Sequence, residues 1–183
     1  PAMLAAGIAA WRAWRVRRGA MPALVAGHSL GEYSALVAAD AMDFAAAVDL
    51  VRFRGQAMQR AVPAGTGAMA AILGLDDALI EAACAEAAAG SVVQPVNYNA
   101  PGQLVIAGEA QAVARAIEAC KARGAKRAVL LPVSVPSHSA LMKPAAEDLK
   151  LRLGELDIRP PRLRVHAFDG GLYTDPESIR DGL

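Results

Sequence analysis

A serine flanked by two glycines stands near the start of the chain, at the end of a short apolar run. The run Ala23-Leu-Val-Ala-Gly27 continues as His-Ser29-Leu30-Gly31, which gives the spacing Gly-x-Ser-x-Gly. A short apolar run is typical of a buried parallel strand, and residues 32–39 favour a helix. Between a strand and a helix, this pattern forms a nucleophile elbow that exposes the serine hydroxyl. The backbone N–H of Leu30 would then face a developing oxyanion. A glycine-serine turn without chemistry is the alternative interpretation.

A serine hydroxyl is a poor nucleophile unless a base takes its proton, and the sequence holds three histidines. His138 lies where an extended segment meets a predicted helix, the same kind of position as Ser29, so it is our candidate for the base. His28 directly precedes the nucleophile and should point away from it. His166 lies in a predicted strand without an obvious partner. Spacing alone leaves a surface role for His138 open.

An arginine interrupts the apolar side of the helix predicted over residues 43–61. Arg54 follows Val51 by three residues and precedes Met58 by four, so it lies within the apolar stripe. A buried guanidinium is costly without an anion beside it. That anion could be an internal carboxylate, in a structural salt bridge, or a substrate carboxylate held bidentately.

Composition excludes several classes of protein. The chain has 183 residues, is 55% hydrophobic and has a formal net charge of +1, so disorder and nucleic acid binding are not expected. Its uninterrupted apolar stretches are too short to span a membrane. Cys84 and Cys120 lie in helical patterns without metal-ligand spacing, so we expect reduced, packed thiols, no metal site and a cytoplasmic protein.

The middle of the chain has the pattern of a small domain of its own. After the break at Pro63-Ala-Gly-Thr-Gly67, the expected order is β-α-β-β-α-β, which is that of a ferredoxin-like unit. The strands are expected over 68–75, 92–98, 103–107 and 126–131, and the helices over 76–89 and 110–123. We therefore predict a ferredoxin-like subdomain at 64–131, inserted into a discontinuous core at 1–63 and 132–183.

The core is expected to be an α/β-hydrolase-like domain with a parallel sheet. Its last third should hold a helix over 140–156, a strand over 163–168, a turn at residues 169–171 and a new helix signalled by Asp175-Pro176. The chain begins within a helical pattern at Pro1 and stops shortly after that last helix has begun. We therefore expect a piece of a longer protein whose remaining strands lie outside it.

Taken together, these motifs resemble those of one family, the malonyl-CoA:acyl carrier protein transacylases of fatty acid synthesis, and more distantly the acyltransferase domains of polyketide synthases. The resemblance covers nearly the whole chain to about residue 165. The matching segments are Gly27-His-Ser-Leu-Gly-Glu-Tyr-Ser34, Arg54-Gly-x-x-Met58, Gly65-Thr-Gly-Ala-Met69, Asn97-x-Asn-x-Pro-Gly-Gln103 and Val135-Pro-Ser-His138.

The resemblance implies a ping-pong acyl transfer. Ser29 would attack the thioester of malonyl-CoA with His138 as base, Leu30 would supply an oxyanion donor, and Arg54 would bind the free carboxylate. The malonyl group would pass to the phosphopantetheine thiol of acyl carrier protein, with coenzyme A thioester as substrate and no cofactor. The resemblance also implies a monomer. A serine esterase or thioesterase, or a non-catalytic remnant that binds a partner, are the alternatives.

The resemblance is incomplete in three places. The family's glutamine-rich loop, which supplies the second oxyanion donor, would precede Pro1, and a segment that orients the histidine would follow Leu183. Where the family often has Asn-Val, this chain has His166-Ala. We therefore expect these residues alone to have weak activity or none.

Overall fold

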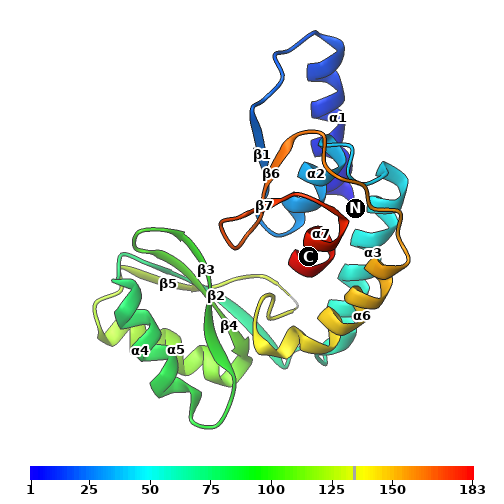
Figure 1. The fold of residues 1–183 in the computed structure, drawn as a ribbon. Helices are drawn as coiled ribbons and strands as arrows, with labels where there is room; N and C mark the ends of the chain where they lie inside the picture. Colours follow the sequence, from blue (N-terminus) through cyan, green and yellow to red (C-terminus); the bar gives the residue numbers. More distant parts are fainter. Residues whose placement is uncertain (134) are drawn as a thin grey trace. The chain divides into compact units, whose positions relative to one another are not determined.

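The computed structural model describes residues 1–133 and 135–183 and shows a mixed α/β chain (Figure 1). It separates into two compact units, one of Pro1–Gly55 with Asp148–Leu183 and the other of Gln56–Glu147. The sequence places the division at 63/64 and 131/132. In the structure, the two units divide at 55/56, within the helix Phe44–Ala61, and at 147/148, within the helix Lys143–Gly154.

The first unit combines helices with a three-stranded sheet (Figure 1). In the sheet, of order β1-β6-β7, β1 pairs parallel with β6 and β6 pairs antiparallel with β7. The helices α3 and α6 cross the boundary between the units. Its elements are α1 (Ala2–Val16), β1 (Leu24–Ala26), α2 (Leu30–Ala38), α3 (Phe44–Ala61), α6 (Lys143–Gly154), β6 (Arg164–His166), β7 (Leu172–Tyr173) and α7 (Pro176–Gly182).

The strand that leads into the serine differs from its prediction. The sequence predicts a buried strand, whereas Leu24 is 42% exposed and Ala26 is also exposed. The strand order explains this, because β1 forms one edge of the sheet that the structure describes. The sequence does not predict the short strand β7, because two residues are too few to show the alternation of apolar and polar side chains that indicates a strand.

The core of the first unit joins residues from both ends of the chain. Side chains from α1, α2 and α3 pack against others from α6, β6, β7 and α7. Fully buried members include Leu4, Tyr33, Leu36, Leu50, Leu153 and Ile179. This shared core holds α2 and α3 in place, and these two helices carry the predicted nucleophile and the predicted carboxylate-binding arginine.

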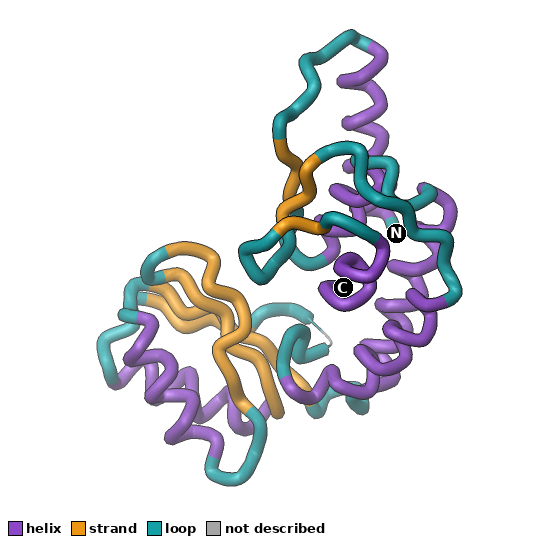
Figure 2. Tube along the Cα trace, in the orientation of Figure 1, coloured by secondary structure: helices purple, strands orange, loops and turns teal. Residues whose placement is uncertain are grey.

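The second unit is a four-stranded antiparallel sheet of order β3-β4-β2-β5 with two helices. Its elements follow in the predicted order: β2 (Gly67–Leu73), α4 (Asp77–Ala88), β3 (Val93–Ala100), β4 (Gln103–Glu109), α5 (Ala110–Ala122) and β5 (Arg127–Leu130). Figure 2 shows α4 and α5 together on one face of this sheet. The buried cluster between them includes Ile72, Ile80, Leu104, Ile106 and Val113.

Two details of the second unit confirm the sequence analysis. The Asp76 carboxylate accepts a hydrogen bond from the Ala78 N–H at 3.0 Å and so caps α4. Cys84 and Cys120 are buried free thiols in the same cluster. Burial raises the pKa of Cys84 to about 12 and also raises the pKa of Cys120, so both thiols stay protonated near neutral pH.

The segment predicted as one helix over 140–156 is two elements. A short 3₁₀ helix, η1 (Ala140–Met142), precedes α6, which ends at Gly154. Among the residues that the structure describes, no helix has both the length and the apolar character needed to cross a membrane.

Candidate active site

The predicted nucleophile lies on a sharp turn between β1 and α2. Ser29 is the N-cap of α2 and has φ 52° and ψ −107°. A positive φ is uncommon for a residue with a Cβ and costs about 1–3 kcal/mol unless the surrounding structure compensates. The turn is closed by the Gly31 N–H donating to the His28 carbonyl at 2.9 Å and the Glu32 N–H donating to the Ser29 carbonyl at 3.1 Å. The strand-turn-helix elbow predicted from the sequence is therefore present.

The two glycines of the motif have different roles. A Cβ on Gly27 would lie 2.0 Å from the carbonyl carbon of Gly31 and 2.5 Å from the Glu32 nitrogen. A Cβ on Gly31 would have no neighbour within 4 Å among the described residues. In the described structure, close backbone approach therefore requires a glycine at residue 27 and does not require one at residue 31.

The backbone N–H of Leu30 opens the first turn of α2. In the described part of the chain, the hydrogen bonds that close the elbow use the neighbouring amides, and no acceptor is found for the Leu30 N–H. The first N–H groups of a helix have no partner within the helix, and the helix dipole makes this end positive. Leu30 thus offers a donor beside Ser29 to which an oxyanion can bind.

Arg54 reaches the nucleophile from α3. Its Nη2 donates a hydrogen bond to the Ser29 Oγ at 2.9 Å, and the guanidinium carbon lies 5.9 Å from the centroid of the Tyr33 ring. The side chain is half-buried. The sequence placed Arg54 on the apolar side of its helix, and in the structure its guanidinium lies against the elbow. Two of the four predicted site residues are therefore in direct contact.

A buried carboxylate lies next to the elbow. Glu32, on the first turn of α2, is 6% exposed and accepts a hydrogen bond from the Tyr173 hydroxyl at 3.1 Å. Burial raises the pKa of Glu32, while the bonds from Tyr173 and from the Phe168 backbone, and the nearby charge of Arg54, partly offset that rise. Glu32 was not singled out from the sequence, although a glutamate one turn into an otherwise apolar helix is a visible signal.

The predicted base belongs to the second unit. His138 is exposed and has φ 65°, so it shares with Ser29 the positive φ that a sharp junction between an extended segment and a helix requires. The Oγ of Ser139 donates to the Pro136 carbonyl at 2.7 Å, and the Ala140 N–H donates to the Gln94 side-chain oxygen at 2.8 Å. The loop that carries His138 is thereby fixed to its own unit. Its pairing with Ser29 stays a prediction.

The other two histidines lie in the first unit. His28 is exposed, and its charge contributes to lowering the pKa of Glu32. The Nδ1 of His166 lies 2.8 Å from the Ala167 carbonyl oxygen. The sequence indicated no partner for His166, and the structure shows one in the adjacent backbone.

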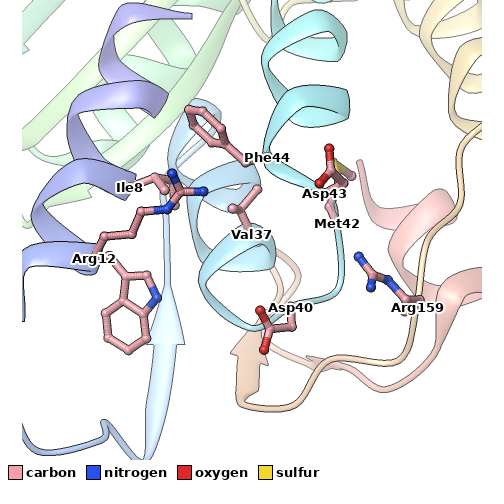
Figure 3. Close-up of a pocket in the computed structure, with 9 residues that line it drawn as sticks. Ile8, Arg12, Val37, Asp40, Met42, Asp43, Phe44 and Arg159 are labelled. Atoms are coloured by element: carbon pink, nitrogen blue, oxygen red, sulfur yellow. The ribbon is translucent and has the colours of Figure 1, made fainter. Parts of the chain in front are cut away.

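A pocket of ≈ 270 Å³ lies elsewhere in the first unit (Figure 3). It is bordered by α1, the end of α2 and the start of α3, and it includes neither Ser29 nor Arg54. The Asp43 carboxylate on its wall already accepts hydrogen bonds from the Ala45 and Ala46 N–H groups, which lower its pKa. Its lining residues are Ile8, Trp11, Arg12, Val37, Asp40, Met42, Asp43, Phe44 and Arg159. Nothing in this lining resembles a nucleophile with its base.

Comparison with known proteins decides the family. The family described as "Acyl transferase domain" matches residues 1–176. The chain belongs to the acyl transferase domain family. This confirms the resemblance to that family that the motifs around Ser29, Arg54 and His138 indicated.

Relatives with assigned names cover the whole chain. It is 59% identical over 184 aligned positions to the malonyl CoA-acyl carrier protein transacylase of Salmonella typhimurium and 53% identical over 185 positions to that of Bacillus subtilis. The alignments include 100% of this chain but only 60% and 58% of those proteins. The chain therefore spans about 60% of the length of the relatives it matches.

Solved structures give the same result. The crystal structure of an acyl carrier protein S-malonyltransferase from Vibrio cholerae is 58% identical with a TM-score of 0.96, and it is matched over 100% of this chain and 60% of that one. A second structure, a type II polyketide synthase acyl carrier protein in complex with its malonyl-transacylase, is 55% identical with a TM-score of 0.98, over 100% of this chain and 59% of that one.

Proposed function

We propose that this chain is the nucleophile-bearing part of an enzyme that transfers a malonyl group from coenzyme A to the phosphopantetheine thiol of acyl carrier protein. The observation that carries the proposal is the hydrogen bond from the Arg54 guanidinium to the Ser29 Oγ within the elbow. An acyl group that ends in a carboxylate needs a cation near the nucleophile, because the two ends of malonate are only a few bonds apart. The names of the relatives support the same substrate and partner.

The mechanism uses four side-chain or backbone groups of this chain. The Ser29 hydroxyl attacks the thioester carbonyl while His138 takes its proton. The carbonyl oxygen becomes an oxyanion, and the Leu30 N–H donates to it. The carbon-sulfur bond then breaks, the thiolate of coenzyme A takes the proton from His138, and a malonyl ester remains on Ser29. Throughout, the Arg54 guanidinium holds the free carboxylate.

The second half reverses these roles with a new thiol. The phosphopantetheine thiol of acyl carrier protein gives its proton to His138 and attacks the Ser29 ester. The oxyanion forms again opposite Leu30, the bond to the serine oxygen breaks, and the proton returns from His138 to Ser29. Charge, atoms and protons therefore balance, and coenzyme A thioester is needed only as substrate.

The architectural details are part of the proposal. The parallel pair β1 and β6 with the elbow before α2 supports an α/β-hydrolase-like core. The order and pairing of the four strands with α4 and α5 support a ferredoxin-like subdomain. We infer that the protein acts as a monomer in the cytoplasm, where fatty acid synthesis would use its product.

The proposal is tested by trapping the ester. The protein expressed from the complete reading frame that encodes these residues is mixed with malonyl-CoA, and acylation is followed by intact mass and by mapping the modified peptide. We expect one malonyl group on Ser29, its transfer to added acyl carrier protein, and no label in Ser29→Ala. Arg54→Ala should load malonyl poorly.

Two results would contradict it. Hydrolysis of simple esters at an unchanged rate in Arg54→Ala, without transfer to acyl carrier protein, would indicate an esterase or thioesterase. An unmodified Ser29 in a folded protein would indicate a remnant without catalysis.

A further inference from the structure

The Arg54 guanidinium is held between two groups of α2. Its Nη2 donates to the Ser29 Oγ at 2.9 Å, and its carbon lies 5.9 Å from the centroid of the Tyr33 ring. A cation within about 6 Å of an aromatic centroid is attracted to the ring face. Ser29 contacts the guanidinium from the turn before α2, and Tyr33 contacts it from the first turns of the helix. The turn and the ring together therefore fix where the guanidinium lies.

The ring itself is a rigid support. Tyr33 is 1% exposed and belongs to the core of the first unit, in the same buried cluster as Leu36 and Leu50. An aromatic side chain has two rotatable bonds, and packing on all sides leaves the ring one orientation. Arg54, by contrast, has a long flexible side chain that is only half-buried. Without the ring, the guanidinium would keep its hydrogen bond to Ser29 and the nearby charge of Glu32, and it would lose the contact with the ring face.

The hydroxyl of Tyr33 does not explain why a tyrosine is present. Among the described residues its oxygen is buried and has no hydrogen-bond partner. A buried hydroxyl without a partner destabilises a fold, because the hydrogen bonds it made to water in the unfolded state are lost. Phenylalanine would fill the same space without this cost. Among the described residues, the contact that joins Tyr33 to the site is the one between its ring and the Arg54 guanidinium.

We propose that Tyr33 is a positioning residue that sets the selectivity of the site for acyl groups carrying a carboxylate. The inference rests on the proposed function, in which Arg54 binds the free carboxylate of the substrate. The ring keeps the guanidinium beside Ser29, where one acyl group can reach both. Substrates without a carboxylate make no use of the guanidinium, so loss of the ring should harm malonyl loading more than acetyl loading.

The functional test compares two thioesters in matched variants of the protein from the complete reading frame. Initial rates of Ser29 acylation by malonyl-CoA and by acetyl-CoA are measured for the wild type, Tyr33→Phe and Tyr33→Leu. Tyr33→Phe keeps the ring and removes only the unpartnered hydroxyl, so its malonyl-to-acetyl ratio should equal that of the wild type. Tyr33→Leu should lower the ratio roughly three- to tenfold. If Tyr33→Leu does not fold, Tyr33→Met is used in its place, because the longer, unbranched methionine side chain adapts better to an irregular space.

A second measurement does not depend on acylation. The guanidinium N–H signals of Arg54 are assigned by NMR through their loss in Arg54→Lys. A proton over a ring face is shifted upfield, so the wild type and Tyr33→Phe should show the shift and Tyr33→Leu should not. If the wild type shows the shift but is not acylated by either thioester, the proposed function fails while the positioning contact stands.

Two results would overturn the inference. The first is an Arg54 signal without a ring shift in the wild type. The second is a malonyl-to-acetyl ratio in the ring-less variants equal to that of the wild type, whether both rates are unchanged or both fall equally, as general damage to the core would produce.

Discussion

Replacing Gly27 by alanine should break the elbow, whereas the same change at Gly31 should not. The added Cβ at residue 27 would lie 2.0 Å from a backbone carbon and 2.5 Å from a backbone nitrogen, well inside the 3.4–4 Å of ordinary contact. Both neighbours are main-chain atoms of the turn, so neither can rotate away. Overpacking of this kind costs about 1–3 kcal/mol, and we expect the upper end of that range.

The change at residue 31 is the matched control. A Cβ there meets nothing within 4 Å in the described structure, and the residue lies in the first turn of α2. Alanine is a better helix former than glycine by up to about 1 kcal/mol, so Gly31→Ala should be as stable as the wild type or more stable. The two variants differ from the wild type by one methyl group each, at positions only four residues apart.

Urea unfolding followed by tryptophan fluorescence measures the free energies of unfolding. Gly27→Ala should have a lower midpoint than the wild type, with a thermal midpoint roughly 3–10 °C lower. Labelling of Ser29 by a fluorophosphonate probe in the folded variants reports the elbow directly, and it should fall in Gly27→Ala because a displacement of about 1 Å can cost a hundredfold in rate. Equal stability and equal labelling of the two variants would refute the geometry described for the elbow.

Three further predictions concern other parts of the chain. Cys84 and Cys120 should react with a thiol reagent at pH 8 only after unfolding, because burial raises both pKa values; rapid labelling of the folded protein would contradict this. Burial raises the pKa of Glu32, so the protonated carboxyl stabilises the fold below about pH 4.5 and this stabilisation is lost as the carboxyl ionises at higher pH. Glu32→Gln does not ionise, so its urea midpoint should rise relative to that of the wild type between pH 4 and pH 7. Hydrogen bonds from the Ser178 and Glu177 N–H groups lower the pKa of Asp175, so Asp175→Ala should destabilise α7 at neutral pH and much less at acid pH. The same loss of stability at both pH values would contradict the capping role.

The elements of the second unit were predictable because each has strong local signals. Asp76 marks the start of α4, the glycine after residue 123 stops α5, and apolar runs mark the strands. The order of these elements in the structure is the order that the sequence indicates. Local signals suffice here because each strand pairs with a neighbour within the same short stretch of chain.

The first unit was harder because its sheet is built from distant pieces. The exposure of β1 depends on its position at the edge of a sheet, which no pattern within residues 24–26 encodes. The strand β7 is two residues long and exists because it pairs with β6. Sequence patterns report which side chains avoid water, but they do not report how many neighbours a strand finds.

At the site, the sequence indicated the residues that could react or bind substrate, but it did not indicate the residues that position those side chains. Ser29, Leu30 and Arg54 follow from a turn pattern and from a cation on an apolar helix face. Glu32 and Tyr33 were passed over, although both lie in the motif that led to the prediction. Their importance comes from contacts with α3 and β7, and such contacts become visible only when the helices are placed in space.

The parallel pairing of β1 with β6 affects how the protein folds while the ribosome synthesises it. Leu24 finds its backbone partner in Arg164, and the whole second unit is synthesised between them. At ordinary elongation rates the first strand must wait roughly ten seconds for its neighbour. During that interval its edge and the apolar faces of α2 and α3 are open to other chains. Cells that make this protein quickly should therefore depend on chaperones to keep the nascent nucleophile segment from aggregating.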